Sequence, residues 1–117
     1  MSKKMQTLVL RHREWLRGKK EGMLLAKTGI KKCCLGVACV QLWGLKPETI
    51  RGVGLPSEVE IPEDVSDILC NYHGEDGAVL EESIAKINDD VSIDDNTRLK
   101  QLRPLFRKLN VKLEFQP

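Results

Sequence analysis

In two stretches of this chain, residues that could form one buried face of a helix recur at every third or fourth position. Over residues 5–17 the repeat predicts an amphipathic helix that stops at Gly18. Over residues 95–109 it predicts a second such helix, capped by Asp94 or Asp95, kinked by Pro104 and ended by Asn110 in a left-handed conformation. The first repeat consists of Met5, Leu8, Val9, His12, Trp15 and Leu16, and the second of Leu99, Leu102, Leu105, Phe106 and Leu109.

Two other stretches have strand patterns. Val111, Leu113 and Phe115 alternate with polar residues, which predicts a strand with one buried face at residues 111–115. Residues 22–34 contain two apolar runs around Lys27-Thr28-Gly29, and this arrangement predicts a hairpin.

The middle of the chain predicts shorter elements. Residues 34–44 suit a helix that Gly44 would end, although a strand is an alternative, and Gly36 would permit close backbone packing. A short helix is expected over residues 63–70, a helix or strand over 78–88, and connections or turns over 47–62 and 74–77. We therefore predict a single α+β domain spanning residues 1–117, with three or four helices packed on a small antiparallel sheet.

Charge is sorted along the chain although the net charge is only +2. Residues 1–32 contain ten Lys/Arg and two acidic residues, whereas residues 58–95 contain thirteen Asp/Glu and one lysine. Residues 96–117 are basic again, with six Lys/Arg and one glutamate. Such sorting predicts a large dipole and a surface that attracts anions.

The sequence also indicates the cellular compartment in which the protein is expected. No apolar run has the length of a membrane span, and no apolar leader follows Met1-Ser2-Lys3-Lys4. The four cysteines fit a reduced environment. We expect a cytoplasmic protein with no membrane partner and no cofactor.

Several short motifs carry a family resemblance. They are Leu24-Leu25, Thr28-Gly29, Cys33-Cys34-Leu35-Gly36 and Ile87-Asn88-Asp89-Asp90. In these motifs the chain resembles a family of small uncharacterised proteins encoded by tailed bacteriophages and prophages, which has no assigned catalytic activity. The resemblance implies the cytoplasm of a host bacterium and an accessory or counter-defence role. Cys70 and His73 lie outside the shared pattern.

Cysteine and histidine suggest two kinds of chemistry. Cys70 and His73 have the spacing of zinc ligands, but Cys34 and Cys39 would point in different directions on a helix, and buried cysteines are usually packing residues. Alternatively, Cys33 or Cys34 at a helix start would have a lowered thiol pKa and act as a nucleophile, with His73 as its base.

Acidic pairs offer a third candidate. Asp89-Asp90 and Asp94-Asp95 would suit a hard cation, although no calcium-loop pattern surrounds them. Helix capping and a solvated surface explain the same residues.

The fourth candidate is a basic face that binds phosphate. It would form if the helix over 5–17 packs beside the predicted hairpin, whereas internal pairing with the acidic middle segment would neutralise it. Arg51, in a glycine-flanked loop, is a further candidate because its planar fork matches phosphate. The other candidates are Arg11, Arg13, Arg17, Lys19, Lys20, Lys31 and Lys32.

These patterns favour a non-enzymatic binding protein that captures an anionic, nucleotide-like ligand or blocks a host defence protein. Nucleic-acid binding through the basic amino-terminal face is one alternative, although aromatic residues for base stacking make up only 4% of the chain. A small cysteine hydrolase is the other. A homo-oligomer is expected if Trp15 or Trp43 is exposed.

Overall fold

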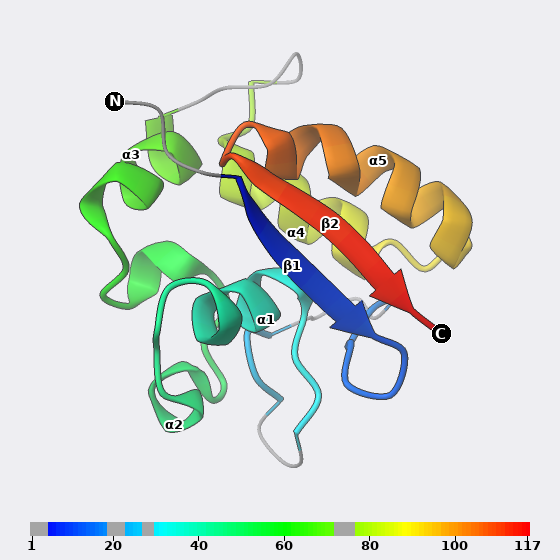
Figure 1. The fold of residues 1–117 in the computed structure, drawn as a ribbon, viewed down its shortest axis with the longest axis horizontal. Helices are drawn as coiled ribbons and strands as arrows, with labels where there is room; N and C mark the ends of the chain where they lie inside the picture. Colours follow the sequence, from blue (N-terminus) through cyan, green and yellow to red (C-terminus); the bar gives the residue numbers. More distant parts are fainter. Residues whose placement is uncertain (1–4, 19–22, 27–29, 72–76) are drawn as a thin grey trace.

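The computed structural model of this protein describes residues 5–18, 23–26, 30–71 and 77–117 (Figure 1). Strand β1 (Gln6–Arg11) comes first and strand β2 (Val111–Gln116) comes last. Between them lie helices α1 (Cys34–Gln41), α2 (Pro47–Ile50), α3 (Glu63–Asn71), α4 (Leu80–Asp89) and α5 (Asp95–Arg107), with the 3-10 turn η1 (Pro56–Glu58) between α2 and α3. The described residues thus form an α+β fold with more helices than the sequence predicted, because α2 lies in the expected connection.

The sheet corrects two predictions. β1 and β2 run parallel, with Gln6 opposite Val111 and Arg11 opposite Gln116, so the expected antiparallel sheet is wrong. Residues 6–11 form a strand, so the helix expected over 5–17 is also wrong. Leu8 belongs to the predicted helical repeat, but it also alternates with Leu10 as in a strand, and both leucines are fully buried. The partner strand decides between the two patterns, because it satisfies the backbone of β1.

The helical predictions for the second half are confirmed. Helix α5 begins at Asp95, and the Asp94 side chain accepts a hydrogen bond from the N–H of Thr97 at 2.8 Å. Pro104 lies inside this helix, and Asn110 has a φ of 59° after it. Helix α3 matches the prediction for residues 63–70, and residues 80–89 form a helix rather than a strand.

Helix α1 comes close to the neighbouring backbone. Gly36 lies so near Leu24 that an added Cβ would overlap the Leu24 carbonyl group. This confirms the packing role predicted for Gly36. The segment before α1 resembles the expected hairpin in that Ala26 N–H donates to Lys31 O at 2.9 Å, while residues 27–29 lie outside the described part. Residues 74–76 of the predicted turn over 74–77 also lie outside it.

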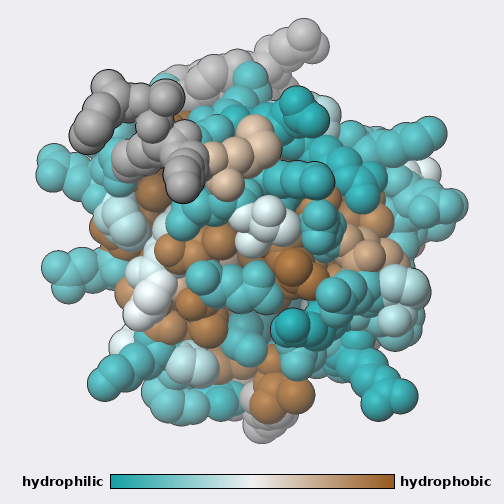
Figure 2. All heavy atoms as spheres, in the orientation of Figure 1, coloured by the Kyte–Doolittle hydropathy of each residue, from teal (hydrophilic) through white to brown (hydrophobic). Residues whose placement is uncertain are grey.

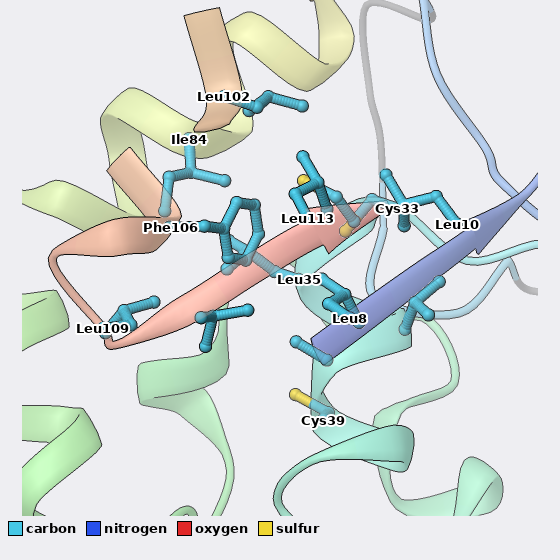
Figure 3. Close-up of a cluster of buried hydrophobic side chains, with 14 of the residues drawn as sticks. Leu8, Leu10, Cys33, Leu35, Cys39, Ile84, Leu102, Phe106, Leu109 and Leu113 are labelled. Atoms are coloured by element: carbon cyan, nitrogen blue, oxygen red, sulfur yellow. The ribbon is translucent and has the colours of Figure 1, made fainter. Parts of the chain in front are cut away.

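The core fills the space between the sheet and the helices. α1 packs beside β1, and α5 packs beside β2 and α4 (Figure 1). Leu8, Leu35 and Phe106 meet there, together with Ile84 and apolar residues of β2 (Figure 3). Figure 2 shows hydrophilic side chains interrupting the hydrophobic surface on the face viewed in Figure 1. None of the helices in the described segments has the length and apolar character that a membrane crossing requires.

Candidate anion-binding site

The parallel sheet brings the carboxyl ends of β1 and β2 to one edge of the molecule. The register aligns Arg11 with Gln116, and His12 N–H extends the ladder by donating to Gln116 O at 2.9 Å. A hollow of about 460 Å³ lies at this edge, lined by Arg11, His12, Arg13, Glu14, Gln116 and Pro117. In α/β sheets, ligands commonly bind outside the carboxyl ends of parallel strands.

A tight turn holds the basic residues of this hollow. Arg11 O accepts hydrogen bonds from the N–H groups of both Glu14 and Trp15 at 3.0 Å. The N–H of Arg13, within the same turn, has no hydrogen-bond acceptor in the described part of the chain. The turn therefore offers a backbone donor beside two guanidinium groups.

The two arginines that line the hollow make few or weak contacts with the described residues of the protein. Arg11 pairs with Glu14 at 3.8 Å, and their side chains are 53% and 43% exposed. A pair of this kind contributes little stability and competes poorly with a strongly charged ligand. Arg13 is exposed and forms no ion pair with any residue that the structure describes. Both guanidinium groups are thus available to an anion.

His12 completes the donor set. Its Nδ1 lies 3.0 Å from Nη2 of Arg17. Because a guanidinium group only donates, Nδ1 must be the acceptor in this contact. The remaining ring nitrogen, Nε2, then carries the proton and is a donor.

Lys31 and Lys32 lie on an adjoining segment. Lys32 forms an isolated parallel bridge with Trp15, in which Lys32 N–H donates to Glu14 O at 2.9 Å and Leu16 N–H donates to Lys32 O at 2.7 Å. Nζ of Lys32 contacts Ile30 O at 3.3 Å, and Lys31 is exposed. The two basic segments are adjacent as predicted, but through an extended pairing and not through a helix.

Arg17, by contrast, is not available to a ligand. Its Nε and Nη2 each donate to a different carboxylate oxygen of Asp95 at 2.8 Å, and its Nη1 donates to Trp15 O at 2.8 Å. The guanidinium also stacks over the Trp15 ring, 4.7 Å from its centroid. These hydrogen bonds hold the pKa of Asp95 below its usual value. The acidic segment therefore neutralises Arg17, which is the internal pairing that the sequence analysis gave as the alternative to ligand binding.

Arg51 is also paired within the fold. It contacts Glu48 at 3.0 Å and donates from Nη1 to Ala26 O at 3.1 Å. The hydrogen bond from Arg51 lowers the pKa of Glu48. Arg51 does not line the hollow at the strand ends, so the structure does not join it to Arg11 and Arg13. Lys19 and Lys20 lie outside the described residues.

A buried polar network, which the sequence did not reveal, is centred on Asn88. Its Oδ1 accepts hydrogen bonds from Trp15 Nε1 at 2.7 Å and from Cys34 N–H at 3.1 Å, and its Nδ2 donates to Leu16 O at 3.0 Å. Asn88 therefore joins α4 to the start of α1 and to the segment after β1. In the sequence, only the Asn-Asp-Asp motif draws attention to Asn88. The residues that it binds are distant along the chain, so no local pattern identifies the network.

Arg98 forms the second half of this network. It is 3% exposed and lies on α5, facing the loop that follows α4. Its Nη1 and Nη2 donate to backbone carbonyls at 2.8–3.1 Å, while its Nε lies 3.6 Å from Asp95 Oδ1 and has no hydrogen-bond partner. The carbonyl acceptors belong to Ile87, Asn88, Asp90 and Ile93.

Cys33, Cys34 and Cys39 are buried, and their burial opposes the thiolate form. Burial raises the pKa of Cys33 and of Cys39 to about 12 and raises that of Cys34 well above its ordinary value. Cys33 does precede α1, as predicted, but loss of hydration outweighs the effect of the helix start. Both cysteine candidates are thus protonated packing residues. His73, the proposed base, lies outside the described residues.

The described residues also do not bring the predicted metal ligands together. In the described segments no three His, Cys, Asp or Glu side chains gather as a metal site would require. Cys70 Sγ instead lies 3.9 Å from both Ser66 Oγ and Glu81 Oε2, while its proposed partner His73 is outside the described residues.

The acidic pairs have structural contacts. Asp94 caps α5 and Asp95 binds Arg17, while Asp90 accepts hydrogen bonds from the backbone and hydroxyl of Ser92. Asp89 accepts from Asn88 Nδ2 at 3.0 Å. The capping interpretation, rather than a cation site, accounts for these residues.

Comparison with protein-family models, curated proteins and solved structures found no match. The phage-type resemblance therefore stays a prediction.

Proposed function

We propose that this protein is a non-catalytic binding protein that captures a phosphate-bearing, nucleotide-like anion at the carboxyl ends of β1 and β2. The observation that carries the proposal is the meeting of Arg11, His12 and Arg13 around one hollow. Arginine forks bind phosphate oxygens in pairs, and the Arg13 N–H adds a donor from the backbone. The hollow of about 460 Å³ falls within the size range of small-molecule sites.

The chemistry of the other candidates supports binding rather than turnover. A cysteine hydrolase needs an accessible thiolate, but Cys33 and Cys34 are buried and their pKa values are raised. The acidic residues nearest the polar network already bind arginine or backbone groups. A capture protein needs only positioned donors, which this edge supplies.

The biological role we propose is accessory or counter-defence activity in a bacterial cytoplasm, as the phage resemblance implies. Withdrawal of a nucleotide-derived signal would fit a protein that binds without consuming its ligand. This role depends on the anion site, and it fails if the site binds no phosphate compound.

Isothermal titration calorimetry with ATP, a cyclic dinucleotide and inorganic pyrophosphate tests the proposal. At least one ligand should bind and be recovered unchanged by chromatography. Arg11→Ala/Arg13→Ala should weaken binding by roughly a hundredfold, since two charge-assisted contacts are lost. Lys46→Ala/Lys86→Ala removes the same charge from exposed positions that do not line the hollow, and should bind normally.

Three results would contradict the proposal. They are the absence of heat with every ligand, equal binding by both double variants, and conversion of the ligand. Tight duplex binding with a steep salt dependence and no mononucleotide binding would favour the nucleic-acid alternative instead.

A further inference from the structure

Every hydrogen-bond donor of the Arg17 guanidinium has an acceptor within the fold. Nε donates to Asp95 Oδ1 and Nη2 donates to Asp95 Oδ2, both at 2.8 Å. Nη1 donates to Trp15 O at 2.8 Å and to His12 O at 3.1 Å, and Nη2 also lies 3.0 Å from His12 Nδ1. A guanidinium group has no further N–H to donate. Arg17 therefore cannot rotate without losing hydrogen bonds.

Ring contacts hold the same group of side chains together. The guanidinium carbon of Arg17 lies 4.7 Å from the centroid of the Trp15 ring and 6.0 Å from that of Phe115. The His12 ring meets Phe115 edge to face, with the centroids 6.4 Å apart. The orientation of His12 is thus set both by a hydrogen bond to Nδ1 and by packing on Phe115.

Asp95 anchors this group to a distant part of the chain. It is the first residue of α5, and both of its carboxylate oxygens accept hydrogen bonds from Arg17. Its side chain does not line the hollow at the strand ends. Any effect of its hydrogen bonds on the hollow must therefore pass through Arg17.

His12 connects this arrangement to the hollow, which it lines beside Arg11 and Arg13. With Nδ1 accepting from Arg17, Nε2–H is the donor that the ring keeps for a ligand. An unprotonated phosphoryl oxygen can only accept, so it matches this tautomer. Resting on the proposed function, we infer that Asp95 is a positioning residue of the anion site. By holding Arg17, it fixes the orientation and tautomer of His12, so that the ring donates to a bound phosphate.

Simple electrostatics predicts the opposite effect for this carboxylate. A negative charge beside an anion site repels the ligand, so its removal should tighten binding. Asparagine at position 95 offers one oxygen and one amide nitrogen, and one Arg17 donor would then face another donor. Arg17 would shift, His12 would lose its fixed orientation and binding should weaken. The direction of the change in affinity separates the two effects.

A double-mutant cycle between Asp95 and His12 tests the inference. Isothermal titration calorimetry measures binding of inorganic pyrophosphate by the unmodified full chain, Asp95→Asn, His12→Ala and the double variant. Each single change should weaken binding roughly tenfold, because one hydrogen bond to the ligand is lost. The double variant should bind within about twofold of His12→Ala, since Asp95 acts through His12. A general loss of structure would instead lower the affinity by the same factor in both backgrounds.

Asp94→Asn is the matched control. It removes the same charge from the neighbouring residue, whose carboxylate accepts from Thr97 N–H, and asparagine also caps helices well. This variant should bind pyrophosphate as tightly as the unmodified protein, or up to about twofold more tightly. Circular dichroism verifies that every variant is folded.

NMR of the histidine rings tests the arrangement without a ligand. The chain contains two histidines, so comparison with His73→Gln assigns the ring signals of His12. At pH 8 the ring proton of His12 should reside on Nε2 in the unmodified protein. In Asp95→Asn it should exchange between the two ring nitrogens.

Four results would overturn this inference while leaving the anion site in place. They are tighter binding by Asp95→Asn, equal factors of loss in both backgrounds, the same weakening by Asp94→Asn, and a proton on Nδ1 of the unmodified protein. Absence of pyrophosphate binding by the unmodified protein would overturn the inference together with the proposed function. The two failures are therefore distinguishable.

Discussion

Arg13 and Arg17 belong to one basic segment, but their surroundings differ completely. Arg17 is 14% exposed in its side chain and binds Asp95, the backbone and the Trp15 ring. Arg13 lies at the strand ends and has no ion-pair partner within the described residues. A guanidinium group becomes structural where carboxylates and carbonyls surround it, and it stays available for binding where the chain turns toward solvent.

The largest loss of stability should follow from replacing Arg98, which, like Arg17, is bound within the fold. Arg98→Ala removes a charged donor group from four backbone carbonyls. Asn88 O and Ile87 O keep the N–H donors of Gly18 and Asp90, whereas Asp90 O and Ile93 O are left without a donor among the described residues. We expect the free energy of unfolding in urea at pH 7 to fall by about 3 kcal/mol, because hydrogen bonds from a buried charged group are lost. Arg107→Ala, an exposed change on the same helix, should alter it by less than about 0.5 kcal/mol. A loss below about 1 kcal/mol for Arg98→Ala would show that water replaces the guanidinium at little cost.

An intermediate effect is expected on the way in which stability changes with pH. Hydrogen bonds from Arg17 lower the pKa of Asp95 from its ordinary 3.8. The resulting stabilisation is present above pH 3.8 and is lost as the pH falls through the lower pKa of the folded state. Asp95→Asn should therefore reduce the drop in melting temperature between pH 5 and pH 2. Some drop should remain, because the pKa values of Asp90 and Asp94 are lowered too.

The control for this pH experiment is Glu60→Gln, at an exposed position. Its acid profile should follow that of the unmodified protein. Identical profiles for Asp95→Asn and the unmodified protein would contradict the importance of the Arg17–Asp95 pair.

The smallest effect should come from the strand ends. Arg11→Ala/Arg13→Ala removes one exposed ion pair and one arginine without an ion-pair partner in the described chain. The free energy of unfolding should change by less than about 1 kcal/mol in urea denaturation. A loss of stability as large as that for Arg98→Ala would show that Arg11 and Arg13 stabilise the fold as the buried arginines do. The two arginines would then not differ from Arg17 and Arg98 in their role.

Local patterns predicted the second half of the fold well. The Asp94 cap, the left-handed Asn110 and the alternation of β2 depend on neighbouring residues, so they were visible in the sequence. The pattern of residues 5–17 predicts a helix where β1 lies, because the strand that stabilises β1 is almost the whole chain away. The candidate site was predicted in part. Arg11 and Arg13 do meet at one hollow, whereas Arg17 and Arg51 are bound within the fold.

The sequence by itself determined where α3 and α5 lie, which residues are apolar enough to form the core, and that basic and acidic side chains are separated along the chain. Only the tertiary structure decided that the two strands run parallel and which arginines remain available. The physical reason is that a strand edge or a charge takes its role from the groups that reach it through space. For β1, Arg17 and Arg98, those groups come from distant segments or from backbone atoms that no side-chain pattern identifies.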